Sequence, residues 1–257
     1  MSGKGVIVFV NNRIYVGTVM LASSRYIKVR AFEPKLSKVL ELKLYRTETF
    51  TIEPLTSLRP TLEDFKKLSN MMNGLKFIQS FDRTYFDAIE DIEKESFVGI
   101  SLPGIKGRFS EISVIAISTW KSIYIFDIMI LGSIEKTFKT ILESKSTKKI
   151  IHDSSNLADY LHHRQKIVLD GVFDTEVAHC SLGFDENRSD LIECLFDHFG
   201  IPEELFDEEV QWHCRPISSS AIRIAALNVA FLKKLHIRLS TLMLNDVKAV
   251  CGLPRHE

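Results

Sequence analysis

Four carboxylates in the second half of the chain have the chemistry of a metal site. They are Asp153, Asp159, Asp170 and Asp174. Hard divalent cations prefer carboxylate oxygens, and a pair of such cations can activate water against a phosphodiester. The same residues also suit structural roles, because Asp153 and Asp174 each precede a predicted helix, where a carboxylate caps free backbone N–H groups. A metal site built from these residues is therefore one hypothesis, and helix capping is the alternative.

Cysteine and histidine offer a second kind of site. Cys194 and His198 lie four residues apart on a predicted helix and share one of its faces, and His213-Cys214 follows. Thiolates and imidazoles are the usual ligands of zinc. Cysteines inside apolar helices are more often plain core residues, and adjacent His-Cys residues bind one ion only with strain. We predict no metal at these positions.

Short runs of β-type composition occupy the first fifth of the chain. They are GVIVFVNN, RIYVGTVMLAS, RYIKVRAFE, KVLELKLY and TFTIEPL. Turn residues separate the runs, and apolar and polar residues mostly alternate over residues 38–45, as expected for strands with one buried face. We predict a small antiparallel barrel of about five strands over residues 1–55.

Helical periodicity follows this region. Thr61-Leu-Glu-Asp64 has the form of a capping box, and Phe65, Leu68 and Met72 share one helical face, so residues 56–92 are predicted to be a helical connector. Apolar residues of this segment could instead form an interface, although core is the safer expectation. These residues are Phe65, Met71, Met72, Phe77 and Ile78.

The remaining residues, 93–257, alternate between strand and helix patterns. Three strand-like runs come first, at residues 97–102, 111–119 and 122–128. Later segments predict further short strands, including Ile167–Leu169, and one long final helix over 219–244. This order predicts a mixed α/β sheet with helices on both faces.

Charge is distributed unevenly although the whole chain has a formal net charge of zero. Through Pro54 there are nine Lys and Arg residues against four Glu, an excess of five positive charges. A basic module is the usual electrostatic route to RNA or DNA, although a small β domain with a basic solvent face would look the same. The expected phosphate contacts are Arg13, Arg25, Lys28, Arg30, Lys35 and Arg46.

Membrane and secreted classes are disfavoured. No run approaches the ~20 apolar residues that a membrane span needs. The first residues lack the pattern of a cleavable leader, and the four cysteines form no CxxC pair, which suits a reducing compartment. We expect a soluble protein of the cytosol or nucleus that has no membrane partner.

The first region resembles the Sm-like fold. The resemblance is carried by Arg13-Ile-Tyr-Val-Gly17, which places glycine where that family's strongly bent second strand has one. The family's Asp-x-apolar-Asn loop would fall at residues 22–24 and its Arg-Gly signature at residues 45–47, and neither is present. The resemblance therefore implies the fold without the family's uridine pocket or ring assembly.

The region from Phe97 to Leu244 resembles the RNase D-like exonuclease superfamily. The landmarks appear in the family's order: Val98-Gly99 on the first strand, His152-Asp153, Phe173-Asp174-Thr175 and Arg215-Pro216-Ile217. Members of that superfamily hold two divalent cations with four acidic residues and orient water with a tyrosine. The resemblance implies an RNase H-like mixed-sheet domain.

The family's metal-binding positions are neutral in this chain. The alignment gives Ser101, Pro103, Leu157 and Asn228 in place of the four acidic ligands, and Ile224 in place of the tyrosine. A pair of doubly charged cations is stable only among several anionic oxygens, so we predict that neither metal nor cofactor binds and that no catalytic residue remains. Asp159 does not substitute for Leu157, because two residues along a helix correspond to about 200° of rotation.

The two regions together resemble the exonuclease 3'-5' domain-containing proteins of the piRNA pathway and, more distantly, the egalitarian RNA-transport proteins. This resemblance implies a catalytically inactive RNA-binding adaptor that forms a homodimer, joins a Tudor-domain partner and resides in cytoplasmic germ granules. Two alternatives stay open. One is an active metal-dependent 3'-5' exoribonuclease with a rewired metal site, and the other is a dimeric assembly platform that binds no RNA.

Overall fold

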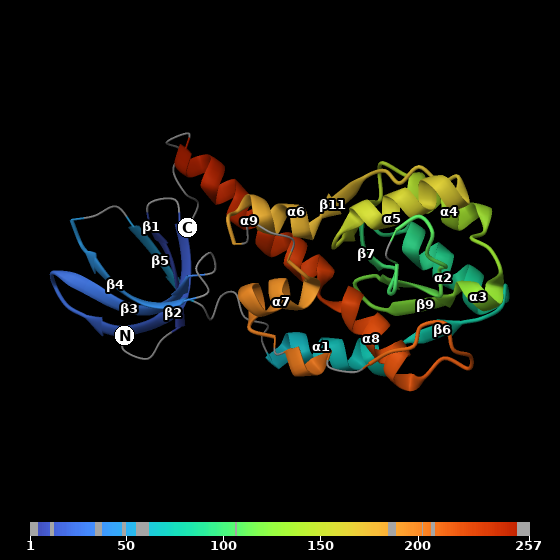
Figure 1. Cartoon of the computed structure of the whole chain (residues 1–257), viewed down its shortest axis with the longest axis horizontal. Coiled ribbons are helices and arrows are strands. Elements are labelled where there is room, and N and C mark those ends of the chain that lie inside the picture. Colours follow the sequence, from blue (N-terminus) through green and yellow to red (C-terminus); the bar gives the residue numbers. More distant parts are fainter. Residues whose placement is uncertain are drawn as a thin grey trace.

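The computed structural model describes residues 5–10, 13–33, 38–47, 50–54, 62–105, 107–184, 189–201, 203–206 and 209–250. These residues form two β-sheets (Figure 1). Each sheet has a hydrophobic core of its own.

The first sheet has five antiparallel strands. They are β1 (Gly5–Val10), β2 (Arg13–Ala22), β3 (Tyr26–Glu33), β4 (Lys38–Tyr45) and β5 (Phe50–Pro54). Their order is β4-β3-β2-β1-β5, so consecutive strands pair as a meander and β5 returns to β1. The five predicted strands are confirmed. Within the described residues, β4 and β5 do not pair with each other, and closure into a barrel stays a prediction.

Alternation along β3 and β4 gives this sheet an inner and an outer face. Ile27, Val29 and Leu44 are buried with Val8 and Val19 in a small core. The residues between them in sequence point the other way, as expected for a strand with a period of two. The pairing of β2 with β3 shifts register between Val19 and Leu21, which begins two residues beyond Gly17.

The second sheet has six strands in mixed directions. They are β6 (Lys76–Ile78), β7 (Phe97–Ser101), β8 (Val114–Ser118), β9 (Ile123–Asp127), β10 (Lys148–Ile151) and β11 (Val172–Asp174). The order is β11-β10-β7-β8-β9-β6. β7, β8 and β9 are antiparallel neighbours, whereas β10, β11 and β6 add in parallel. The predicted mixed sheet is confirmed.

Helices cover both faces of the second sheet. The helical elements are α1 (Leu62–Asn73), α2 (Arg83–Glu93), α3 (Ile128–Leu131), α4 (Lys136–Glu143), α5 (Ser154–Tyr160), η3 (Leu161–Gln165), α6 (Thr175–Ser181), α7 (Leu191–Phe199), η4 (Glu203–Leu205), α8 (Ser219–Ala230) and α9 (Leu232–Val250). Ile115 and Ile117 of β8 pack with α2, α4 and α5, while Val114 and Ala116 pack with α8 on the opposite side. None of the described helices is both long and apolar enough to cross a membrane.

Part of the predicted connector, residues 56–92, belongs to the domain of the second sheet. Residues 76–78, which were expected to be helical, form strand β6 and pair in parallel with β9. Tyr85, Ile89 and Ile92 of α2 belong to the core of the second sheet. Of the apolar residues that were weighed as interface, Ile78 is buried and Met71, Met72 and Phe77 pack against core clusters. The side chain of Phe65 and Thr61 lie outside the described residues.

Two other predictions were wrong. Ile167–Leu169 is not a strand, because backbone N–H groups of this segment bond to α4 and not to a neighbouring strand. The Val168 N–H donates to the Glu143 carboxylate and the Asp170 N–H to the Leu142 carbonyl. The long final helix is broken after Ala230, where the Val229 carbonyl accepts the Ser118 hydroxyl in addition to the Phe231 N–H. The break lets α8 pack on β8 and β9 while α9 passes over β7 and β10.

Candidate functional site

A pocket of about 120 Å³ lies at the edge of the second sheet where β7 ends. Its lining comprises Ile100, Ser101, His152, Leu191, Asn228 and Leu232. The pocket therefore brings together Ser101 and Asn228, two of the five positions that the sequence marked as a degenerate metal site.

The other three marked positions are packed into the protein interior. Pro103 is buried just beyond β7. Leu157 on α5 is 4% exposed and joins the core between the sheet and α2, whereas Ile224 on α8 packs with α7 and α9. These side chains contribute apolar contacts and no ligand atom.

Close approach of a helix to a strand builds the pocket. Gly99 lies on β7 beneath α8, and a Cβ atom there would be 3.0 Å from the Val229 carbonyl oxygen and 2.6 Å from the Ser118 hydroxyl. Glycine thus permits α8 to approach, which carries Asn228 to the end of β7. β10 runs parallel to β7, so its end delivers His152 to the same edge.

His152 is a pocket residue that the sequence marked only as a landmark. Its Nδ1 lies 3.0 Å from the Thr175 hydroxyl and its Nε2 lies 2.9 Å from the Ser189 carbonyl oxygen. Burial lowers the pKa of His152, which favours the neutral ring. Since both ring nitrogens are engaged within the fold, His152 anchors α7 and α6 to the sheet. Its place at the carboxyl end of a parallel strand was the available sequence signal.

The donor set of the pocket does not fit a pair of divalent cations. Ser101 and Asn228 supply a neutral hydroxyl and a neutral amide, and the other lining residues are apolar apart from the engaged His152. Magnesium gives up its water reluctantly and is usually held by carboxylates. Neutral oxygens offset little of the repulsion between two such ions.

Two of the four aspartates, Asp153 and Asp174, organise the turn between β10 and α5 and the start of α6. Asp174 caps α6 by accepting the Glu176 N–H at 2.9 Å, which confirms its predicted capping role, and it also accepts the Ser154 N–H at 2.7 Å. Asp153 was expected to cap α5. It makes no such bond and instead accepts the Ser155 hydroxyl and the Asn156 amide, because Asp174 supplies the cap.

The other two aspartates, Asp159 and Asp170, are each bound to a different partner outside the pocket. Asp159 accepts two bonds of 3.0 Å from the Arg108 guanidinium, and Asp170 accepts the Gly171 N–H at 2.6 Å. None of the four carboxylates lines the pocket. Among the described residues, the geometry thus does not gather them into one site.

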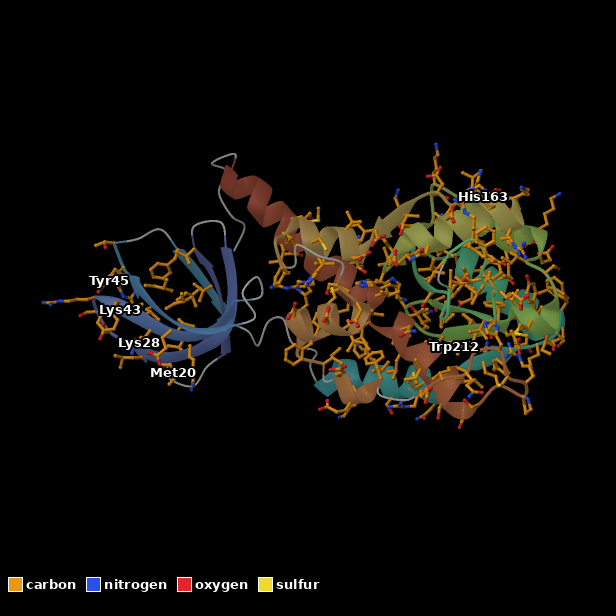
Figure 2. All side chains as sticks on the ribbon, viewed as in Figure 1. Met20, Lys28, Lys43, Tyr45, His163 and Trp212 are labelled. Atoms are coloured by element: carbon orange, nitrogen blue, oxygen red, sulfur yellow. The ribbon has the colours of Figure 1, made fainter. Side chains whose placement is uncertain are left out.

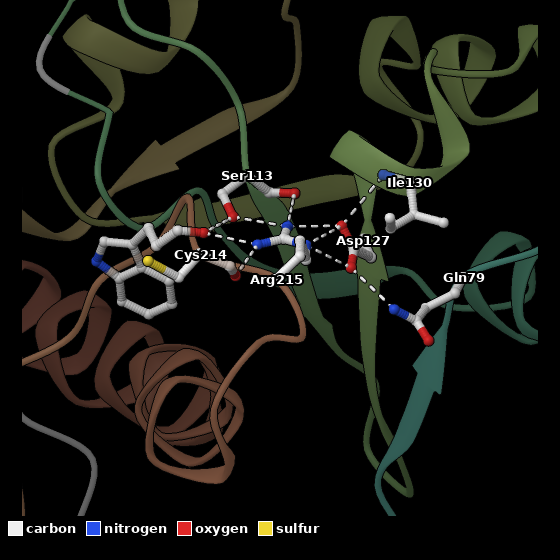
Figure 3. A network of polar contacts seen from close by, with 7 residues as sticks. Gln79, Ser113, Asp127, Ile130, Cys214 and Arg215 are labelled. Atoms are coloured by element: carbon white, nitrogen blue, oxygen red, sulfur yellow. Dashed lines mark hydrogen bonds and ion pairs between the residues drawn. The ribbon is translucent and has the colours of Figure 1, made fainter.

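Arg215, the landmark that precedes Pro216, is a structural anchor (Figure 3). It bonds to the fully buried carboxylate of Asp127 at 2.6 and 2.9 Å and to the Ser113 hydroxyl at 2.9 Å. Gln79 also donates to Asp127, at 3.1 Å. The arginine therefore ties the segment before α8 to β9 and to the start of β8.

A buried histidine pair replaces the zinc arrangement that could be drawn from the sequence. Cys194 and His198 are joined by His179 of α6, and not by His213-Cys214. His179 Nδ1 lies 2.9 Å from His198 Nε2, which is a hydrogen-bond distance. Burial raises the pKa of the Cys194 thiol and lowers that of His198, so both groups are neutral. No sequence pattern marked His179, which lies 19 residues from His198.

The expected phosphate contacts lie on the first sheet where the structure describes them. Arg25, Arg30 and Arg46 are exposed, and Lys28 is half-buried in an ion pair with Glu41. Arg13 belongs to β2, but its side chain and all of Lys35 lie outside the described residues. Lys28 and Arg30 lie on β3, Arg25 in the turn that precedes it and Arg46 directly after β4.

Comparisons with known proteins agree with this architecture. Residues 103–244 match a family described as 3'-5' exonuclease. The chain is 33% identical over 171 residues to the piRNA biogenesis protein EXD1 of Bombyx mori, which covers 62% of this chain and 54% of that protein. It is 32% identical over 178 residues to the Protein Exd1 homolog of Drosophila melanogaster, covering 67% of each. An Egalitarian protein homolog of Caenorhabditis elegans is 34% identical over 131 residues, 48% of this chain and 22% of that protein.

A solved structure supports the fold of the second domain. The RNase D of Trypanosoma brucei in its GMP complex superposes with a TM-score of 0.58 at 16% identity, covering 66% of this chain and 58% of the other. The matched segment spans about half the length of the silkworm relative. With the family match over residues 103–244 and the relatives above, the chain belongs to the 3'-5' exonuclease-domain family of EXD1 proteins, with an α/β RNase D-like fold.

Proposed function

We propose that this chain is an RNA-binding adaptor of piRNA biogenesis whose exonuclease-like domain does not hydrolyse RNA. The lining of the pocket at the end of β7 carries the proposal, because Ser101 and Asn228 offer neutral oxygens there. Two-metal hydrolysis holds its cations roughly 4 Å apart and depends on anionic ligands to do so. A pocket without carboxylates lacks the means to hold them.

The family resemblance supplies the correspondence between this pocket and a metal site. It assigns Ser101, Pro103, Leu157 and Asn228 to the ligand positions and Ile224 to the position of the tyrosine. The burial of Pro103 and the packing of Leu157 and Ile224 in hydrophobic clusters are consistent with this assignment, since none of the three offers a ligand atom.

Two features support RNA as the partner. The first sheet carries exposed cations, which can bind phosphates without sequence preference. The relatives are named for piRNA biogenesis. We assign residues 1–55 to an Sm-like barrel on the resemblance and on the return of β5 to β1. On the basis of the resemblance, we also propose that the chain forms a homodimer, binds a Tudor-domain partner and resides in cytoplasmic germ granules.

Incubation of the purified chain with 5'-labelled single-stranded RNA and Mg²⁺ or Mn²⁺ tests the loss of activity. We expect the RNA to keep its length while Escherichia coli RNase D, an exoribonuclease, shortens it under the same conditions. Divalent-dependent shortening that disappears in Asp153→Asn or Asp174→Asn would instead establish the alternative, an active exoribonuclease with a rewired metal site.

Titration of the same RNA at increasing salt tests the binding role. Phosphate contacts release counterions, so the logarithm of the affinity should fall linearly with the logarithm of the salt concentration, by about 0.7 per contacted phosphate. Absence of binding at physiological salt, together with a tight dimer, would favour the assembly platform instead.

A further inference from the structure

Two tyrosines lie side by side on the outer face of the first sheet. Tyr26 of β3 is directly opposite Tyr45 of β4, and their ring centroids are 6.1 Å apart at an interplanar angle of 57°. Lys28 and Lys43 form the next outward pair of the same two strands. Figure 2 shows Tyr45, Lys43, Lys28 and Met20 following one another down the left side of the view, across strands β4, β3 and β2.

Cations surround the two rings. The Lys43 ammonium lies 4.4 Å from the centroid of Tyr26 and 5.1 Å from that of Tyr45. Tyr45 raises the pKa of Lys43, mainly through a hydrogen bond, so the amine stays charged at neutral pH. Arg30 lies next to Lys28 on the outer side of β3, and Arg46 follows Tyr45 directly. Glu41 is the outward carboxylate of β4, and it is bound to Lys28 at 2.9 Å.

Apolar side chains complete the same surface. Met20 is 46% exposed, Leu21 is 47% exposed and Tyr45 is 42% exposed. Leu21 is opposite Lys28 in the register of β2 and β3, so it continues the surface onto the third strand. We call this set the tyrosine face and define it by Met20, Leu21, Tyr26, Lys28, Arg30, Lys43, Tyr45 and Arg46.

The chemistry of the tyrosine face fits one kind of ligand best. Its excess of positive charge selects an anionic partner. Its flat rings, of which Tyr45 is exposed and Tyr26 half-buried, select one that also has flat apolar groups. A single RNA strand has both, because its phosphates are charged and its unpaired bases expose their π faces. Grooves that combine cations with aromatic side chains bind single strands in this way. A duplex keeps its bases stacked inside and would offer only its phosphates.

We propose, on the basis of the proposed RNA-binding role, that the tyrosine face stacks the bases of single-stranded RNA. Tyr45 and Tyr26 provide the stacking surfaces, while Lys28, Arg30 and Arg46 contact the flanking phosphates. Lys43, which lies over both rings in the free protein, moves from the rings to a phosphate when a base enters.

Anisotropy titrations of the full chain with a labelled single-stranded oligonucleotide and its duplex test this assignment. Tyr45→Leu and Tyr26→Leu remove a ring and keep an apolar residue suited to a strand. Each should weaken single-strand binding about 5- to 100-fold, the range for the loss of one stacked base, and leave the salt dependence unchanged. Lys28→Gln should lower the salt slope by about 0.7, as expected for one lost phosphate contact. Phe109→Leu, which removes an 88% exposed ring from the second domain, is the matched control and should bind as the native chain does.

The possible results separate the two proposals. If the native chain binds RNA and both tyrosine variants, folded by circular dichroism, bind equally well, the stacking assignment is wrong while the RNA-binding role stands. If the native chain binds neither single strand nor duplex, the proposed function fails and the stacking assignment fails with it. If the tyrosine variants keep RNA affinity but lose a co-purifying protein, the tyrosine face is a protein-docking surface and the assignment is overturned. Equal affinity for single strand and duplex would also contradict it.

Discussion

Ser101 and Asn228 are neutral side chains at two positions of the pocket where the resemblance places acidic metal ligands. Both side chains line the same pocket, where a carboxylate would be nearly isosteric with the Asn228 amide and larger than the Ser101 hydroxyl by one carbon and one oxygen. Charge, and not shape, is what the proposal for this pocket depends on. Introducing charge therefore makes a direct test.

Ser101→Asp combined with Asn228→Asp should create affinity for Mn²⁺. Two carboxylates in so small a pocket repel each other, so the double variant should melt below the native chain in EDTA. Mn²⁺ should then raise its Tm, because a ligand that binds only the folded state stabilises it. The native chain and a neutral Ser101→Asn control should melt at the same temperature with Mn²⁺ and with EDTA. A Mn²⁺-dependent rise in the Tm of the native chain would contradict our view of the pocket.

Glu41→Gln should strengthen RNA binding. The pKa of Glu41 is lowered, chiefly by its hydrogen bond with Lys28, so the carboxylate is ionised and neutralises that lysine. The amide removes a repulsive charge and frees Lys28, so we expect single-strand affinity to rise about two- to tenfold at low salt and the gain to fade as salt increases. Anisotropy titration at two salt concentrations measures both effects. Unchanged or weaker binding at low salt would argue that RNA does not contact this face.

Lys233→Met should stabilise the protein at neutral pH. Lys233 is 4% exposed, its ammonium lies 4.7 Å from the Trp120 ring, and it has no hydrogen-bond partner among the residues that the structure describes. Burial lowers its pKa to about 8, against the raising effect of the nearby carboxylates Glu95 and Asp91. Below pH 8 the folded protein keeps a buried charge, so its removal should raise the free energy of unfolding by about 1–2 kcal/mol after the lost ring contact is subtracted.

The pH dependence of that variant gives a second readout. Between pH 8 and 10.5 the unfolded chain holds the Lys233 proton that the folded chain has released, so the stability of the native protein rises with pH in this window. The advantage of Lys233→Met should therefore shrink from pH 7 to pH 10. Urea denaturation at both values measures it, with exposed Lys121→Met as control. An advantage that grows with pH would show that the lysine is charged and well paired.

The contact between β7 and α8 sets the geometry of the pocket at the scale of elements. Gly99→Ala places a methyl group 3.0 Å from a backbone carbonyl of α8, which has no freedom to rotate away. We expect a loss of about 1–3 kcal/mol in the free energy of unfolding, typical of overpacking, measured by urea denaturation. Val98→Ala on the same strand is a useful comparison, since it should destabilise by leaving a cavity instead. A neutral effect of Gly99→Ala would mean that α8 does not lie so close to the strand.

Elements were predictable from the sequence where one pattern extended over many residues. The five strands of the first sheet and the antiparallel β7, β8 and β9 each have a clear run of β-type residues, and their order implied a mixed sheet. β6 was missed because three residues carry too little pattern, and only its pairing with β9 makes it a strand. Ile167–Leu169 has a strand-like composition, but its surrounding backbone bonds to α4.

The site was predictable only in part, for a related reason. The family landmarks indicated Ser101 and Asn228, which do line one pocket. Leu191 and Leu232 join them through packing of α7 and α9 that no local pattern encodes, whereas His152 arrives with the end of β10, a position that the strand pattern indicated. The exchange of roles between Asp153 and Asp174 likewise depends on β11 lying beside β10, which brings Asp174 to the start of α5.

At the scale of the whole molecule, the two sheets have separate hydrophobic cores. The first sheet encloses one small cluster around Val8, Val19, Ile27, Val29 and Leu44, whereas the clusters of the second domain combine residues from α1 to α9. Each described cluster draws on one sheet alone. This separation suits a division between a binding module and an RNase D-like scaffold.

A chain limited to residues 62–250 should therefore fold without the first sheet. Its three clusters contain every element from α1 onward, so we expect its main thermal transition to lie within a few degrees of that of the full chain, since a difference of 1 kcal/mol would shift Tm by about 2–4 °C in a domain of this size. Single-strand RNA affinity should fall steeply and lose most of its salt dependence, because the cations of the tyrosine face are gone. Calorimetry and anisotropy titration on the same preparation measure both. If the shortened chain folds and binds RNA with the native salt slope, the phosphate contacts lie on the exonuclease-like domain, and the basic charge of the first sheet serves another purpose.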